Sequence, residues 1–62
     1  MTILTFQEAA KYLKISEHGF HILIRKEPIP CFKLGRLFRF NKEKLDKYLE
    51  EKAKEADKLY RP

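Results

Sequence analysis

The segment Glu27-Pro28-Ile29-Pro30 constrains the fold of this chain more than any other. Proline has no amide donor and disfavours the helical conformation for the residue before it, so a helix must end here. Before this break, Phe20, Leu23 and Ile24 recur at helical spacing. After it, apolar and polar residues alternate over residues 31–40, which is typical of strands. The chain is therefore expected to change from helix to β-hairpin at this segment.

The length of 62 residues predicts one domain over residues 1–62, near the lower limit for folding without disulfides or a bound metal. Five Phe and three Tyr can supply an aromatic core. The single cysteine, Cys31, excludes an internal disulfide and fits a reducing compartment. No apolar run is long enough to span a membrane, and the N-terminus lacks a signal-peptide pattern. A cytoplasmic protein without membrane contact is expected.

The net charge of +5 is concentrated in the middle of the chain. Residues 1–10 contribute −1, residues 43–62 hold six charges of each sign, and residues 11–42 hold eight Lys or Arg against two Glu, which gives +6. A basic patch on a small domain is typical of a nucleic-acid surface, although a solvated basic face is the plainer explanation.

Two helices are expected before the break. Thr5-Phe6-Gln7-Glu8 fits a capping box, so a first helix should span about Phe6 to Leu13, with Leu4 available for a short third strand.

Ile15, in the turn after the first helix, is expected to fold inward. Ser16 should cap a second helix from Glu17 to about Lys26. Gly19 inside it costs about 1 kcal/mol against alanine, so it indicates either a close backbone approach or a marginal helix.

The hairpin register is predicted from the alternation of side chains between the two faces of a strand. Placing Phe32, Leu34, Phe38 and Phe40 on one core-facing side requires an odd loop, Gly35-Arg36-Leu37. That loop pairs Leu34 with Phe38 and Lys33 with Arg39. The two cations would then lie side by side on the outer face, an unfavourable arrangement that a polyanion would relieve.

A third helix should begin after Asn41, near Lys42, and continue to about Lys58. Leu45, Tyr48 and Leu49 are expected to pack on the domain. Beyond them, residues 51–62 are expected to form a projecting helical tail with a thin apolar ridge, Ala53, Ala56, Leu59 and Tyr60. The predicted fold class is α+β: a small winged helix-turn-helix, with a two-stranded wing and a C-terminal helix after the helix-turn-helix.

The order of these elements resembles the excisionase-type family of MerR-like winged helix-turn-helix DNA-binding domains. The resemblance covers about residues 3–50. It is carried by Leu4-Thr5, Glu8-Ala9-Ala10, Tyr12-Leu13, Ser16, Leu23-Ile24-Arg25, Pro30, Leu34-Gly35-Arg36, Arg39-Phe40, Leu45 and Leu49. It implies sequence-directed binding of double-stranded DNA. It further implies a recombination directionality factor that bends DNA and assists an integrase. A tyrosine or serine integrase is the expected partner, and adjacent copies of the chain are expected to bind DNA cooperatively.

The resemblance implies that the second helix enters the major groove while the wing lies on the adjacent backbone or minor groove. By position it assigns DNA contacts to Ser16, Arg25, Arg36 and Arg39. The residues themselves add five further candidates from the same helix and wing: Glu17, His18, His21, Ile22 and Lys33.

Three positions depart from the family pattern. Glu27 stands where glycine is usual, Ile22 where a basic residue is frequent, and His21 where an aromatic such as Tyr is common. These departures leave the DNA sequence preference open.

Rival functions also stay open, namely a transcriptional regulator or a protein-interaction module that uses the C-terminal ridge.

His18, His21 and Cys31 are metal-ligand types, but they lack a fourth ligand and paired-cysteine spacing, so no zinc site is predicted. No cofactor is predicted. No nucleophile–base set or phosphate loop is identifiable, so a non-enzyme is expected.

Overall fold

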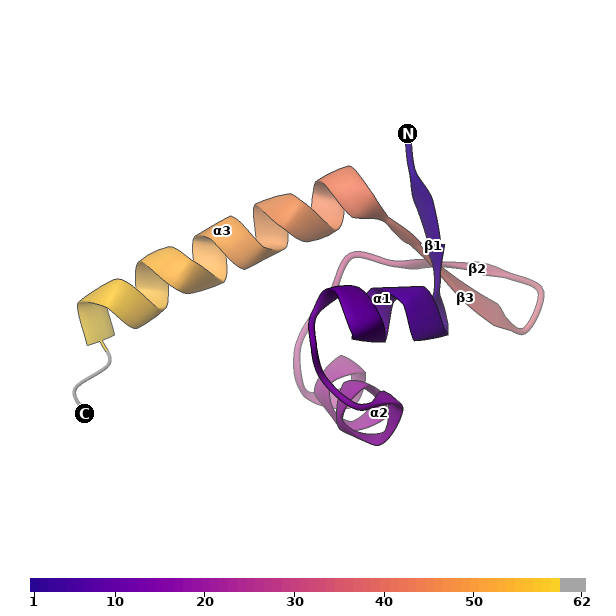
Figure 1. Ribbon diagram of the computed structural model, residues 1–62, viewed down its shortest axis with the longest axis horizontal. Helices are drawn as coiled ribbons and strands as arrows, with labels where there is room; N and C mark the ends of the chain where they lie inside the picture. The colour runs from indigo at the N-terminus through magenta and orange to yellow at the C-terminus, as the bar shows by residue number, and fades with distance from the viewer. Residues whose placement is uncertain (60–62) are drawn as a thin grey trace.

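The computed structural model describes the backbone of residues 1–59 and the side chains of residues 1–55. Its elements, in chain order, are β1 (Ile3–Thr5), α1 (Phe6–Tyr12), α2 (Glu17–Lys26), β2 (Phe32–Leu34), β3 (Leu37–Asn41) and α3 (Lys42–Leu59). The wing formed by β2 and β3 lies at one end of the molecule, and α3 runs away toward the other end (Figure 1). This arrangement is an α+β winged helix-turn-helix, which confirms the predicted fold class.

The three strands form one antiparallel sheet in the order β1-β3-β2. Leu4 lies opposite Phe40, so the short third strand expected at Leu4 is present. In the wing, Leu34 lies opposite Leu37, and only Gly35 and Arg36 form the loop. Gly35 has a φ of 65°. A positive φ at the first position of a two-residue loop is typical of a type II′ turn, which glycine adopts without strain.

The predicted odd loop is therefore wrong. Lys33 lies opposite Phe38 and Phe32 lies opposite Arg39, so the two cations occupy opposite faces of the wing. Phe38 and Phe40 do reach the core. Phe32 and Leu34 stay exposed because this register puts them on the other face of the sheet, opposite Arg39 and Leu37.

Local capping signals fix where each helix begins. The Thr5 hydroxyl accepts from the Glu8 amide at 3.1 Å while the Glu8 carboxylate accepts from the Thr5 amide at 2.8 Å, which confirms the capping box. Ser16 caps α2. The Asn41 side chain accepts from the amides of residues 43 and 44 at the start of α3. Helix α2 ends at Lys26, because the following residue, Glu27, has an extended backbone and precedes Pro28.

The turn between α1 and α2 is closed by a left-handed residue, Lys14, with a φ of 59°. The Lys14 amide donates to the Lys11 carbonyl, and the Ile15 amide donates to the Ala10 carbonyl. This pair of bonds is the Schellman arrangement that ends many helices. Ile15 is 37% exposed, so the prediction that it folds inward is wrong.

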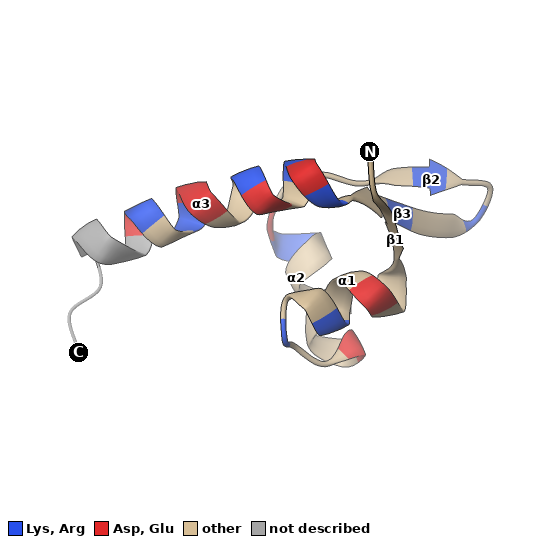
Figure 2. Cartoon of the chain, turned by 45° about the horizontal axis from the view of Figure 1, so that its top comes forward, with Lys and Arg blue, Asp and Glu red and all other residues tan. Residues whose placement is uncertain are grey.

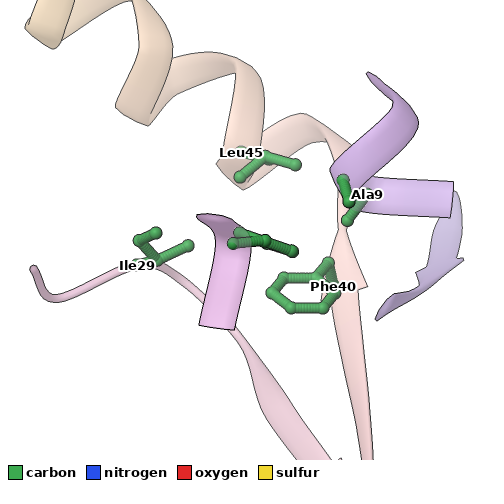
Figure 3. Packing of buried hydrophobic residues seen from close by; sticks show 6 residues of the cluster. Ala9, Ile29, Phe40 and Leu45 are labelled. Carbon is green, nitrogen blue, oxygen red and sulfur yellow. The ribbon is translucent and has the colours of Figure 1, made fainter. Parts of the chain in front are cut away.

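The core joins all parts of the chain around two phenylalanines. Phe20 of α2 and Phe40 of β3 are fully buried, with ring centroids 5.2 Å apart. Ala9 of α1, Ile29 of the proline segment and Leu45 of α3 belong to the same buried cluster (Figure 3). Phe6, Leu13, Leu23, Ile24 and Tyr48 cover this cluster from the outside. The small side chain of Ala9 lets α1 approach the rest of the core closely.

Side-chain contacts attach the first half of α3 to the helix-turn-helix. The Tyr12 hydroxyl donates to Asp46, which also pairs with Lys42. The Glu27 carboxylate accepts from the Tyr48 hydroxyl and pairs with Lys52. Residues 50–55 are exposed, and α3 extends beyond the domain (Figure 1). Ala53 of the expected ridge is exposed, whereas Ala56, Leu59 and Tyr60 lie outside the residues whose side chains are described.

Candidate nucleic-acid interface

Helix α2 divides into a buried stripe and an exposed stripe on opposite faces. Phe20, Leu23 and Ile24 face the core. The exposed stripe consists of His18, His21, Ile22 and Arg25, a spacing that places all four on one helical face. Ile22 is 40% exposed although it is apolar. A face that combines a cation, two imidazoles and an isoleucine offers hydrogen-bond donors and a methyl contact, which are the groups that read base edges.

The N-terminus of α2 is shaped by contact between Ser16 and Gly19. The Ser16 hydroxyl accepts from the Gly19 amide at 3.0 Å. A Cβ at position 19 would lie 3.2 Å from that oxygen, so any larger residue would push the hydroxyl aside. Gly19 is therefore explained by close approach of the cap. Because the Ser16 side chain caps the helix, its first role is structural.

A shallow groove connects α2 to the wing. It is lined by Glu17 and His21 from α2, by Arg36 and Arg39 from the wing, and by Thr5, Phe6, Gln7, Leu37 and Phe38. The His21 ring stacks on Phe6, with centroids 4.3 Å apart. Phe6 also stacks on Phe20, so the core fixes the position of His21 at the groove. The groove thus joins four of the predicted site residues in one surface.

The three wing cations differ in how freely they can move. Lys33 Nζ lies 4.7 Å from the centroid of the Phe38 ring, a cation–π contact. Arg39 Nη1 donates to the Phe38 carbonyl at 2.7 Å, which ties this side chain back to its own strand. Arg36 is exposed at the tip of the turn. Among residues 1–55, none of the three forms an ion pair with a carboxylate.

The distribution of charge distinguishes this surface from α3. No acidic residue occurs between Glu27 and Glu43, so every charged residue of the wing is basic. Figure 2 shows isolated basic positions on the wing and alternating acidic and basic positions along α3. The positive potential is therefore concentrated at the wing, where a polyanion would be attracted.

Three carboxyl groups at the contacts between elements have lowered pKa values. Hydrogen bonding to Lys52 holds the pKa of the Glu27 carboxyl below its ordinary value. The Tyr12 hydroxyl does the same for Asp46, helped by Lys42. A hydrogen bond from the Thr2 amide lowers the pKa of Glu43. These contacts hold α3, β1 and the helix-turn-helix together, so their role is structural.

Sequence reasoning missed the part of the groove contributed by α1. Gln7 lines the groove beside Glu17, with an exposed amide that can donate and accept hydrogen bonds. A glutamine in the first turn of a helix resembles an ordinary solvated residue. Only the tertiary contact between the start of α1 and the wing reveals its position.

Within residues 1–55, no three side chains of His, Cys, Asp or Glu are grouped so that they could hold a metal ion. In the part of the chain that the structure describes, no helix has the length and apolar character needed to cross a membrane.

A sequence model of a family described as a helix-turn-helix domain matches residues 3–53, from β1 to the exposed part of α3. Comparisons with curated proteins and with solved structures found no significant match.

Proposed function

Because the chain belongs to the helix-turn-helix domain family, which is a DNA-binding family, we propose that α2 enters the major groove of duplex DNA and that the wing grips the flanking backbone or minor groove. The exposed stripe of α2 is the observation that carries this proposal. It lies opposite the buried stripe, and the groove joins it to the cationic wing. The proposed role is binding without catalysis.

Each side chain of the stripe has a contact suited to its chemistry. Arg25 can donate two hydrogen bonds to a guanine edge, and His18 and His21 can donate to base or phosphate oxygens. Ile22 can contact a thymine methyl group. Glu17 at the helix start can accept from a cytosine amino group. Ser16 and the free amides beside it can face a phosphate, as helix N-termini commonly do.

The wing would supply sequence-independent affinity. Lys33, Arg36 and Arg39 can neutralise phosphates, and an arginine at a hairpin tip can also enter a narrow minor groove.

We further propose that the chain acts as an excisionase-type accessory factor that bends its site and assists a tyrosine or serine integrase. This finer role is supported by the resemblance in residues 3–50. Smooth bending of a short site by tens of degrees costs about 1–6 kcal/mol, so several cooperatively bound copies or the integrase would offset that cost. An excision assay with and without the protein separates this role from transcriptional regulation, in which promoter output changes and excision does not.

Fluorescence anisotropy with labelled duplex DNA at several salt concentrations tests the binding mode. The wild type should bind more weakly as salt rises. The double variant Arg36→Ala/Arg39→Ala should show a salt slope that is shallower by up to about 2, because each phosphate contact contributes about 0.9 to the slope. Lys47→Ala/Lys54→Ala is the matched control, since it removes the same charge from exposed positions on α3.

Equal slopes for the two double variants would show that the wing does not touch phosphates. Failure of the folded wild type to bind any duplex at low salt would remove DNA binding itself. The exposed part of α3 and its protein partners would then be the surface to test.

A further inference from the structure

Two leucines at the tip of the wing lie outside the core. Leu34 and Leu37 face each other directly before and after the Gly35-Arg36 turn, and they are 57% and 56% exposed. We infer that this leucine pair enters the minor groove beside Arg36 and unstacks a base step, which kinks the duplex. The inference rests on the proposed DNA binding and names the side chains that would produce the bend.

The position of the leucines favours DNA as their partner. They flank Arg36, an exposed cation at the tip of the wing, and no carboxylate occurs between residues 28 and 42. The turn that they flank lies at one end of the molecule, opposite the end reached by α3 (Figure 1). An apolar pair at a cationic tip matches the composition of minor-groove wedges, in which arginine reads the groove and an aliphatic side chain inserts between bases.

The dimensions of the tip explain why insertion would deform the duplex. Paired strands lie about 4.8 Å apart, whereas the minor groove of B-DNA is only about 6 Å wide. The backbone of a two-residue turn approaches this width before its side chains are counted. Leu34 and Leu37 therefore fit only if the groove opens, and the apolar surface of an unstacked base step would then cover them.

A second copy of the chain is a weaker candidate for this surface. Stable protein interfaces bury about 800 Å² on each partner, far more than two half-exposed leucines provide. The neighbouring exposed residues on the same sheet face, Ile3 and Phe32, are interrupted by Arg39, which is paired with Phe32 in the sheet. A cation in the middle of the patch disfavours an apolar interface and favours a phosphate neighbour.

The test measures the bend and the affinity separately. A duplex of about 30 base pairs, selected from a random-sequence library by the wild-type protein, carries a fluorophore pair at its ends. Wild-type protein at saturation should raise the energy transfer between the ends. Leu34→Ala/Leu37→Ala should still bind, but its energy transfer should fall to near that of free DNA. Leu34→Met/Leu37→Met retains apolar side chains of similar volume and should restore the bend.

A control variant and a mismatched duplex test the inference further. Ile3→Ala removes apolar surface from the same sheet face, at the end away from the tip, and should leave the bend unchanged. A mismatch inside the selected site lowers the cost of unstacking, so the wild type should bind it about tenfold more tightly than the matched duplex. The alanine pair should lose most of this preference. Circular dichroism checks that each variant is folded, as expected for replacements at exposed positions.

Three outcomes would overturn the inference. A folded alanine pair that bends DNA as the wild type does would exclude the wedge while leaving DNA binding intact. A bend that is unchanged while sedimentation shows loss of self-association would assign the leucines to contact between copies. Recovery of no bound duplex from the library would remove the proposed DNA binding, and the wedge with it.

Discussion

Lys14 occupies a position that the fold would fill better with glycine. Its φ of 59° lies in the left-handed region, where a side chain costs roughly 1–2 kcal/mol. The two backbone hydrogen bonds that close the turn require this conformation, because they return the chain from α1 toward α2. The sharp corner of the helix-turn-helix is thus obtained at the expense of strain at one exposed residue.

Replacing this residue should therefore stabilise the protein. Lys14→Gly relieves the strain but adds about 0.4–1 kcal/mol of freedom to the unfolded chain, so a net gain of about 0.5–1 kcal/mol is expected. Urea unfolding at neutral pH measures it. Lys14→Ala is the control, since it removes the same charge and keeps the left-handed penalty. Equal stability of the glycine and alanine variants would show that the turn is unstrained.

Arg36 and Arg39 should contribute differently to DNA binding although both belong to the wing. Arg36 is exposed at the tip, whereas Arg39 is half-buried and donates to the Phe38 carbonyl. Arg36→Ala should lower the salt slope of binding by about 0.9 without changing the melting temperature. Arg39→Ala should lower the melting temperature and change the slope less. Anisotropy and thermal melts of the two single variants test this, and a reversed order would show that Arg39 leaves its carbonyl on binding.

At the scale of elements, the helices could be predicted because their signals are local. The capping box at Thr5, the cap at Ser16 and the stop at Pro28 each act within four residues, and each appears in the structure as expected. The wing register could not be obtained from the assumption that both strands face the core. β2 is an edge strand, so only β3 contributes side chains to the core cluster. Glycine at the first position of a two-residue loop is a local signal, and it agrees with the observed register.

The candidate site likewise has one part that can be predicted from the sequence and one part that cannot. The exposed stripe of α2 follows from helical periodicity, because the spacing of His18, Ile22 and Arg25 puts them on one helical face. The groove depends on the stacking of His21 on Phe6 and on the approach of α1 to the wing. These are contacts between distant residues, and they leave no periodic trace in the sequence.

Helix α3 is expected to consist of a part required for stability and a part that is dispensable for folding. Lys52 pairs with Glu27 and lies 6.0 Å from the Tyr48 ring centroid, while residues 53–55 are exposed. A chain ending at residue 55 should match the full chain in melting temperature and DNA affinity. A chain ending at residue 50 should melt at a lower temperature, because it lacks Lys52, and should bind DNA equally well once folded.

Thermal melts and anisotropy on the two shortened chains check this division. Loss of integrase recruitment or self-association in both, with DNA affinity intact, would assign the removed segment to partner binding. Unfolding of the chain that ends at residue 55 would contradict the prediction, since it would mean that residues 56–62 belong to the folded core.

For the whole molecule, charge has two separate roles in two separate places. Within residues 1–55, the wing cations form no ion pair with a carboxylate, so their charge can neutralise phosphates. On α3 the cations instead pair with carboxylates: Lys52 pairs with Glu27 at the end of α2, and Lys42 pairs with Asp46 within α3 itself. Salt should therefore weaken DNA binding strongly and protein stability only slightly, because exposed ion pairs contribute little to folding.

The paired carboxylates predict that acid destabilises the fold. The Glu27, Glu43 and Asp46 carboxyls have pKa values below their ordinary values of 4.5 and 3.8 because each accepts hydrogen bonds in the folded state. The unfolded chain therefore binds protons at a higher pH than the folded chain. The resulting stability is fully present above about pH 5 and is lost as the pH falls through the lowered folded-state values.

Urea unfolding at intervals from pH 7 to pH 2.5 measures this loss. Glu27→Gln and Asp46→Asn keep the shape of each side chain but remove its titration, so each variant should be less stable at pH 7 and should lose less stability on acidification. The double variant should have the flattest profile, since the two carboxylates join α3 to different helices and their effects should add. A wild type whose stability is the same at pH 7 and pH 3 would mean that these contacts are too solvated to contribute. In that case α3 would be held by Leu45 and its apolar neighbours alone.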